Sequence, residues 1–135
     1  MGGFVDPSRE NWQAFKDLPR DTPIHMLNLI KFRVVADYPE GHPNHGKGLT
    51  GREAYAIYLE GFQRLVAGDG AAMVWDAQQE CVVTGPAGEW DEVFVMGYPN
   101  SGVFMAMVKN EEYVRDVVPH RSAAVADSRL IRFRG

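Results

Sequence analysis

Apolar residues recur at two different spacings along the chain, and the first half predicts a helix, a strand and a second helix. Residues 6–18 have helical spacing, and Asp6 is a residue type that caps helices. Residues 23–33 are rich in branched and aromatic side chains and predict a buried strand. After a loop rich in proline and glycine over residues 36–49, the sequence T-G-R-E at residues 50–53 is a capping box that predicts a helix start.

The second half of the chain predicts a β-hairpin, further helix and a final strand. Residues 72–84 and 89–99 have the composition of strands, and the intervening G-P-A-G at residues 85–88 predicts the hairpin turn. Helical spacing returns after Asn100 and continues to Pro119, where we expect the helix to stop. The chain closes with the strand-like sequence SRLIRFR.

After the first helix the element order is β-α-β-β-α-β, which predicts an α+β, ferredoxin-like fold with a four-stranded antiparallel sheet. We expect one domain over residues 1–135, with residues 1–22 as an N-terminal helical extension and residues 23–133 as the core. Both core helices lie on one face of such a sheet, and the other face is often wet and polar.

The predicted strands are apolar on both faces, so the face without helices needs a cover. Each large apolar side chain left in water forfeits roughly 1.5–3 kcal/mol. The N-terminal helix is one candidate for part of that cover. A second copy of the same sheet is the simpler one, and we therefore expect a homodimer with its two sheets packed face to face.

A succession of short segments resembles a known family: MLNLIKFR, AYAIY, EWDEVFVMGYP, EEY and HR followed by ADSRLI. Over about residues 23–133 this succession is similar to the domain-of-unknown-function family 1330, in the dimeric α/β-barrel superfamily. The resemblance implies a barrel-like dimer. It implies no activity, because relatives in the superfamily include cofactor-free oxygenases, lactone isomerases and haem enzymes.

Composition narrows the class of partner. The chain has 14 basic and 18 acidic residues and a formal charge of −4, so we expect no nucleic acid partner. Cys81 is the only cysteine, which excludes an intrachain disulfide, and its strand-like surroundings predict a small buried residue. We expect no signal peptide, no membrane span and a cytoplasmic location.

The most promising polar positions are His120 and Arg121, directly after Pro119. One interpretation makes them cations that complement the dipole at a helix end. The other makes them catalytic or ligand-binding residues at a pocket, because an arginine fork matches a carboxylate and a histidine moves protons near neutral pH. The sequence leaves both interpretations open.

Four further residues are candidates for ligand binding. Asn28 interrupts an apolar strand, either as a structural amide or as a donor to a ligand carbonyl. Tyr58, Trp75 and Tyr98 are either core aromatics or pocket walls with one polar tip each.

The other histidines give weaker indications of a functional site. His42 and His45 lie three apart in a loop without the rigid spacing of a helical metal pair, so we expect a mobile polar loop, able to act as a lid, and no metal. We expect no cofactor; haem with His120 or His25 as axial ligand is a distant alternative.

No pattern in the sequence identifies a particular reaction. We expect a small-molecule-binding protein whose ligand is a small unsaturated or aromatic acid, and which acts as a cofactor-free enzyme of the isomerase or monooxygenase type, with His120 as acid or base. The alternative is a non-catalytic homodimeric module for ligand sensing or interaction. For this alternative we expect a fully solvated His120 region and no cavity of about 300 Å³ or more.

Overall fold

The computed structural model describes residues 3–135. Its elements are α1 (Arg9–Asp17), β1 (Ile24–Phe32), α2 (Gly51–Val66), β2 (Ala72–Ala77), β3 (Glu92–Tyr98), α3 (Ser101–Lys109), the π-helical turn η1 (Tyr113–Val117), α4 (Val118–Ala124) and β4 (Val125–Arg134). The strands form one antiparallel sheet in the order β2-β3-β1-β4. This arrangement confirms the predicted α+β, ferredoxin-like fold.

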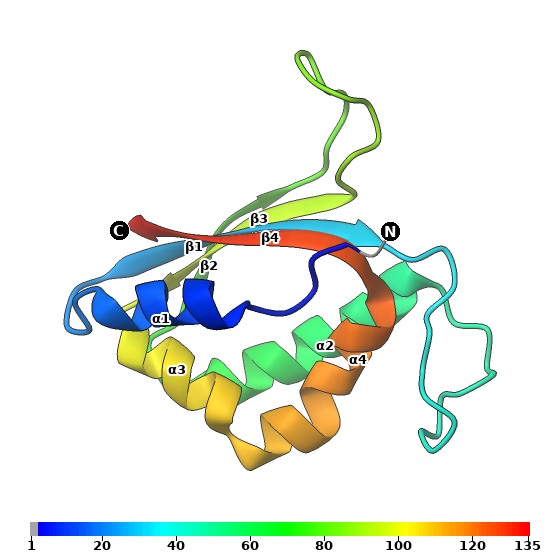
Figure 1. Ribbon diagram of the computed structural model, residues 1–135, viewed down its shortest axis with the longest axis horizontal. Helices are drawn as coiled ribbons and strands as arrows, with labels where there is room; N and C mark the ends of the chain where they lie inside the picture. The colour runs from blue at the N-terminus through cyan, green and yellow to red at the C-terminus, as the bar shows by residue number, and fades with distance from the viewer. Residues whose placement is uncertain (1–2) are drawn as a thin grey trace.

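All the helices lie on one side of the sheet (Figure 1). We call the side toward the helices the inner face; its strand residues are buried and include Met26, Ile30, Phe94 and Met96. We call the opposite side the outer face; its strand residues alternate with the first set and include Leu27, Leu29, Val93 and Val95. Helix α1 lies on the inner side, so it does not cover the outer face.

The core fills the space between the inner face and the helices, with α2 packed most deeply. Ile30 and Tyr55 are at most 1% exposed. Helix α2 starts beside the end of β1, where the Gly51 amide donates to the Arg33 carbonyl at 3.2 Å. A Cβ at Gly51 would lie 2.2 Å from that carbonyl oxygen, so only glycine permits this approach.

The helix starts follow local capping rules. At α2 the predicted capping box is present: the Glu53 amide donates to Thr50 Oγ1 at 3.0 Å, and the Thr50 amide donates to Glu53 Oε1 at 2.9 Å. At α1 the cap is Ser8, whose hydroxyl accepts from the Asn11 amide at 3.1 Å. The expectation that Asp6 caps a helix over residues 6–18 is therefore wrong, because Ser8 lies next to the first helical residue and Pro7 remains outside.

Pro119 does not stop a helix, contrary to the prediction. It lies in the first turn of α4, directly after the wide turn η1. In a regular α-helix the proline ring collides with the carbonyl four residues earlier. The π-helical turn opens the backbone there: the Val118 amide donates to the Tyr113 carbonyl five residues earlier. The helix therefore continues to Ala124 and carries His120 and Arg121 within it.

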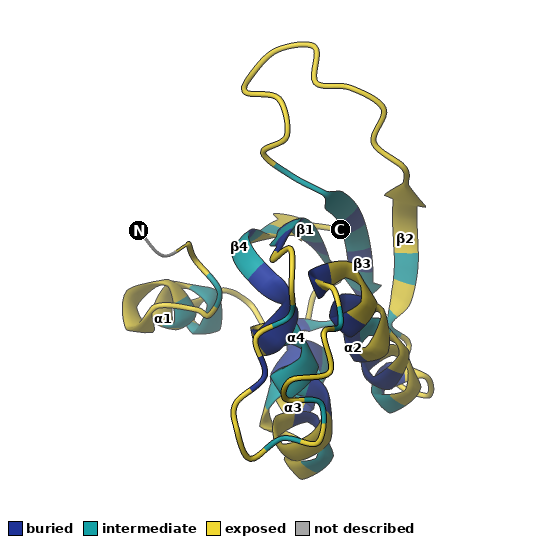
Figure 2. Ribbon diagram, turned by 90° about the vertical axis from the view of Figure 1, so that its right-hand side faces the viewer, coloured by how far each residue is buried: buried dark blue, intermediate teal, exposed yellow. Residues whose placement is uncertain are grey.

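The predicted hairpin is present, but β2 ends at Ala77 rather than at residue 84. Residues 78–91 form an exposed loop that rises on the outer side of the sheet (Figures 1 and 2). Asp91 accepts from the Phe32 amide at 2.9 Å, so the returning chain is tied to β1 there and pairs with β2 only from Val93, which lies opposite Ala77. Cys81 lies in this loop and is exposed, so its predicted burial is wrong.

Within residues 3–135, every helix is too short or too polar to pass through a lipid bilayer.

We expect Ile30→Ala to lower the free energy of unfolding by about 2–5 kcal/mol, because it leaves a cavity in the core. Ile57 on α2 is 39% exposed, and Ile57→Ala is the matched control, with an expected change within about 0.5 kcal/mol. Urea unfolding measures both. Equal losses in the two variants would contradict the assigned core.

Candidate functional site

A cavity of about 950 Å³ lies between the inner face of the sheet and the helices. Pockets for small molecules usually measure about 300–1,000 Å³. Its walls are mostly aromatic and aliphatic, and they include Trp12, Phe15, Met26, Asn28, Tyr55, Tyr58, Phe62, Phe94, Met96, Tyr98, Phe104, Tyr113, Arg121 and Ser128. Its size fits a small molecule, not a single water.

Four phenol groups belong to this wall. The hydroxyls of Tyr58 and Tyr113 lie 3.1 Å apart and share a hydrogen bond. Burial raises the pKa of both residues, and it does the same for Tyr55 and Tyr98. All four side chains are therefore neutral phenols near pH 7; one proton of the Tyr58–Tyr113 pair is used in their shared hydrogen bond, and the other phenol protons can be donated to a ligand.

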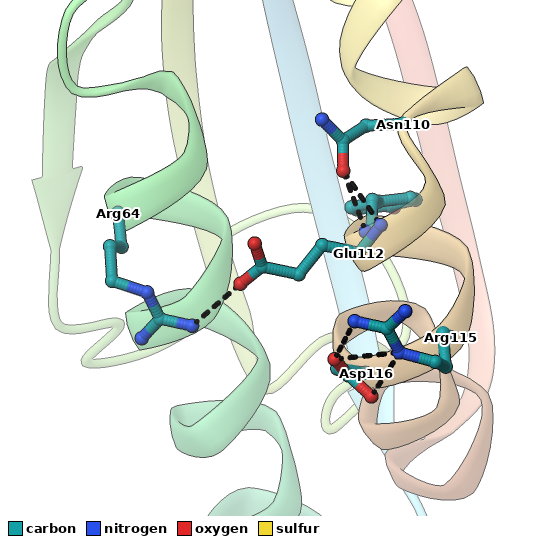
Figure 3. A network of polar contacts seen from close by, with 6 residues as sticks. Arg64, Asn110, Glu112, Arg115 and Asp116 are labelled. Carbon is teal, nitrogen blue, oxygen red and sulfur yellow. Dashed lines mark hydrogen bonds and ion pairs between the residues drawn. The ribbon is translucent and has the colours of Figure 1, made fainter.

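The position of Tyr113 follows from a cap at the start of its helical segment. Figure 3 shows Asn110 at this cap and Glu112 directed toward Arg64. Asn110 Oδ1 accepts from the amides of Glu112 and Tyr113 at 2.8 and 3.1 Å. Glu112 in turn pairs with Arg64 on α2 at 3.3 Å. The cap and the ion pair hold η1 against α2, and this brings the phenol of Tyr113 to that of Tyr58.

Arg121 brings a positive charge to this largely apolar wall. Its Nη1 donates to the carbonyl oxygen of Val5 at 2.6 Å, and its Nη2 donates to Ser128 Oγ at 3.3 Å. Among residues 3–135, no carboxylate lies within 4.0 Å of this guanidinium. A half-buried cation held only by neutral oxygens is a favourable partner for an incoming anion.

Asn28, Tyr58 and Tyr98 line the same cavity as Arg121, so the structure brings four of the six candidate residues together. Asn28 extends from β1 on the inner face, and its Nδ2 donates to the Met26 carbonyl at 3.1 Å. Tyr58 and Tyr98 are buried, at 7% and 5% exposure. The alternation of the predicted strand places Asn28 correctly on the face of Met26.

His120 points away from the cavity, although it is the neighbour of Arg121. Its Nδ1 lies 2.6 Å from the hydroxyl of Tyr38, and its ring meets that of His42 edge to face at 5.3 Å. Tyr38 stacks on His42 at 4.6 Å. The loop over residues 36–49 is therefore anchored to α4 by this cluster, and it forms no part of the cavity wall.

Trp75 is the other candidate that lies elsewhere. An irregularity in β2 between Met73 and Trp75 leaves Trp75 opposite Val95 on the outer face, 50% exposed. His25 is also on that face, opposite Gly97 and Phe133. In the described part of the chain, no three His, Cys, Asp or Glu side chains are grouped to hold a metal ion.

Two solved structures are similar to this chain over almost its full length. The first, the crystal structure of methylated RPA0582 protein, is 41% identical with a TM-score of 0.89, covering 100% of this chain and 96% of that one. This chain belongs to the family of the RPA0582 protein. The second is the RPA0582 protein of unknown function from Rhodopseudomonas palustris, 40% identical with a TM-score of 0.87, covering 98% and 97% of the two chains.

No family model and no curated protein matches the chain. Membership of the RPA0582 family therefore indicates the fold but no activity. The resemblance to family 1330 stays a prediction.

Sequence reasoning missed two parts of the site and one residue of a separate pocket. Ser128 and the carbonyl of Val5 contact Arg121, but backbone atoms carry no signal in a sequence. Glu92 lines a second pocket of about 170 Å³ beside Asp76, and one of its carboxylate oxygens is buried without a partner. Burial raises the pKa of Glu92. An acidic residue at the start of an apolar strand was the available signal.

The His120 cluster predicts a loss of stability in mild acid. Burial of the ring lowers the pKa of His120, the charge of His42 lowers it further, and Asp116 opposes both. The folded state therefore resists protonation. The contribution of neutral His120 to the free energy of unfolding is fully present above the ordinary histidine pKa of about 6.5. It is lost as the pH falls below that value.

We expect the free energy of unfolding to fall between about pH 7.5 and about pH 5.5 by more in the wild type than in His120→Asn. Urea unfolding at the two pH values measures the difference. Equal pH dependence in both proteins would exclude His120 as the responsible group.

Proposed function

We propose that the cavity binds a small amphipathic acid with an aromatic or unsaturated body, and that Arg121 holds its carboxylate. The observation that carries this proposal is the position of Arg121: a positive charge on an apolar cavity wall with no carboxylate beside it among the described residues. A planar guanidinium matches the two oxygens of a carboxylate.

The charge of the cavity wall supports an anionic ligand. Apart from Arg129, which pairs with Asp127 at 2.7 Å, the described residues along it include one acid, Asp6, and four cations, Arg9, Lys109, Arg121 and Arg132. The whole chain has the opposite balance, with a formal charge of −4. Positive charge is therefore concentrated at the cavity of an acidic protein, and this attracts anions to the site.

The aromatic wall supports a ligand with an apolar body. Trp12 and Phe15 of α1 stack on one another at 5.3 Å between ring centroids and face Phe104 of α3 at 6.2 and 5.4 Å. Tyr58 and Tyr98 add further ring surface from α2 and β3. Such side chains remove an apolar ligand from water and orient flat rings by stacking or edge contacts.

The side chains that line the cavity favour binding, as in ligand sensing, over catalysis. The described lining residues contain no histidine, and His120 faces the loop over residues 36–49 instead. The phenols of Tyr58 and Tyr113 stay protonated near pH 7 and serve as hydrogen-bond donors, not as bases. The cofactor-free isomerase or monooxygenase therefore ranks second.

We also propose that the protein is a homodimer joined through the outer face. Half-exposed aliphatic and aromatic side chains cover that face, including Val74, Trp75 and Phe133 at 50–51% exposure. The loop over residues 78–91 rises on the same side and carries Val83 at 92% exposure. A twofold-related copy offers the same flat apolar surface, and two sheets pack well at about 10 Å separation.

We expect Arg121→Gln to weaken binding of 3-phenylpropanoate by about 10- to 100-fold, because hydrogen bonds to a charged group contribute about 1.5–3 kcal/mol. Titration calorimetry measures the affinity, with the uncharged 3-phenylpropanamide as the ligand control. Arg115→Gln is the protein control, since Arg115 is exposed and pairs with Asp116. The proposal fails if the wild type binds acid and amide equally.

For the dimer, light scattering of the wild type at micromolar concentration is expected to give twice the 15.1 kDa of one chain. Leu27→Lys places a charge in the centre of the outer face and is expected to give a folded monomer. Ile57→Lys, at an exposed position on α2, is expected to remain dimeric. A wild type of 15.1 kDa would rule the dimer out.

A further inference from the structure

Residues 3–7, which we call the N-terminal strap, lie along the start of β4, and residues 4–7 form part of the cavity wall. Two of the carbonyl groups of the strap accept hydrogen bonds from Arg121, the anion-binding residue proposed above, and from its neighbour Ser128. The Val5 carbonyl accepts from Arg121 Nη1 at 2.6 Å, and the Phe4 carbonyl accepts from Ser128 Oγ at 2.8 Å. Arg121 and Ser128 also contact one another at 3.3 Å.

The arginine N–H and the serine hydroxyl that donate to these two carbonyl oxygens lie close enough to donate instead to the two oxygens of one carboxylate. We propose that the strap is a displaceable stand-in for the ligand: the carboxylate of a bound acid accepts the hydrogen bonds that Arg121 and Ser128 now donate to the Val5 and Phe4 carbonyls, and the strap leaves Arg121. This inference rests on the proposed function, because it concerns how the same site exchanges its occupant.

The exchange is favourable at Arg121 because the strap leaves its charge uncompensated. A carbonyl oxygen is neutral, whereas a carboxylate adds a charge-assisted bond in a partly dehydrated site. The strap has anchors of its own that oppose its release. The Phe4 amide donates to Asp127 Oδ1 at 2.9 Å, and Arg129 lies over the Phe4 ring at 5.0 Å. The acid and the strap therefore compete.

Helix α1 stays in place during this exchange, because its attachment is separate. Arg132 donates to the carbonyls of Phe15 and Pro19 at 3.2 and 2.7 Å and lies over the Phe15 ring. Trp12 and Phe15 contact Phe104. The aromatic wall for the apolar part of the ligand therefore remains when the strap moves.

Gly3 allows the strap to be undocked without changing any side chain of the cavity. A Cβ at Gly3 would lie 2.2 Å from the Ala126 carbonyl oxygen, so Gly3→Val forces the strap away from β4. Gly41 is the matched control, because a Cβ there meets nothing within 4 Å. Both substitutions leave Arg121 and Ser128 intact.

The experiment compares 3-phenylpropanoate binding to the wild type, Gly3→Val and Gly41→Val by titration calorimetry. We expect Gly3→Val to bind the acid on the order of fivefold more tightly, because the competitor is removed, and Gly41→Val to bind it as the wild type does. Hydrogen exchange of the wild type is expected to show faster exchange at the Phe4 amide when the acid is bound, since reciprocal coupling releases the strap.

The outcomes separate this inference from the proposed function. Binding that depends on Arg121 but is unchanged in Gly3→Val, with the Phe4 amide equally protected, overturns the strap exchange and leaves the proposed function standing. Weaker binding to Gly3→Val also overturns it, because the strap then belongs to the binding site. If the wild type and Gly3→Val both bind the acid no better than its amide, both proposals are refuted.

Discussion

The position of one guanidinium connects the main parts of this molecule. Arg121 extends from α4, bonds with Ser128 on β4 and bonds with the carbonyl of Val5, so it joins segments that are far apart in the sequence. A charge on an apolar wall is costly unless polar atoms surround it. Here neutral oxygens stabilise the charge without cancelling it. The same contacts therefore hold the N-terminal strap in place and keep the site receptive to an anion.

The two faces of the sheet are linked by the alternation of each strand. In β1, Leu27 on the outer face lies between Met26 and Asn28, which both line the cavity. A second copy packed on Leu27 and Val95 would therefore fix the strands that form the floor of the site. The helices cover only the inner face, so the proposed dimer and the proposed binding function depend on the same few strands.

Local rules account for what the sequence predicted well. The capping box at Thr50 and the alternating apolar positions of β1 depend on neighbouring residues alone. The predictions that were wrong concern positions whose structure depends on residues farther away. Pro119 stays within a helix because η1 widens before it, and Trp75 turns outward because β2 is irregular against β3. Arg121 was predictable as an anion-binding residue, but its backbone partner Val5 was not, since every residue has a carbonyl.

Adjacent residues on a helix point about 100° apart, and this explains why His120 and Arg121 serve different parts of the molecule. His120 faces Tyr38, while the carbonyls of Ala123 and Ala124 accept from the amides of Asp37 and Arg33. These backbone and side-chain bonds hold α4 firmly on its loop side. On its cavity side the contact of Arg121 with the strap is a side-chain bond to a single neutral oxygen. When an anion reaches Arg121, the strap is therefore the part that yields, and α4 keeps its place.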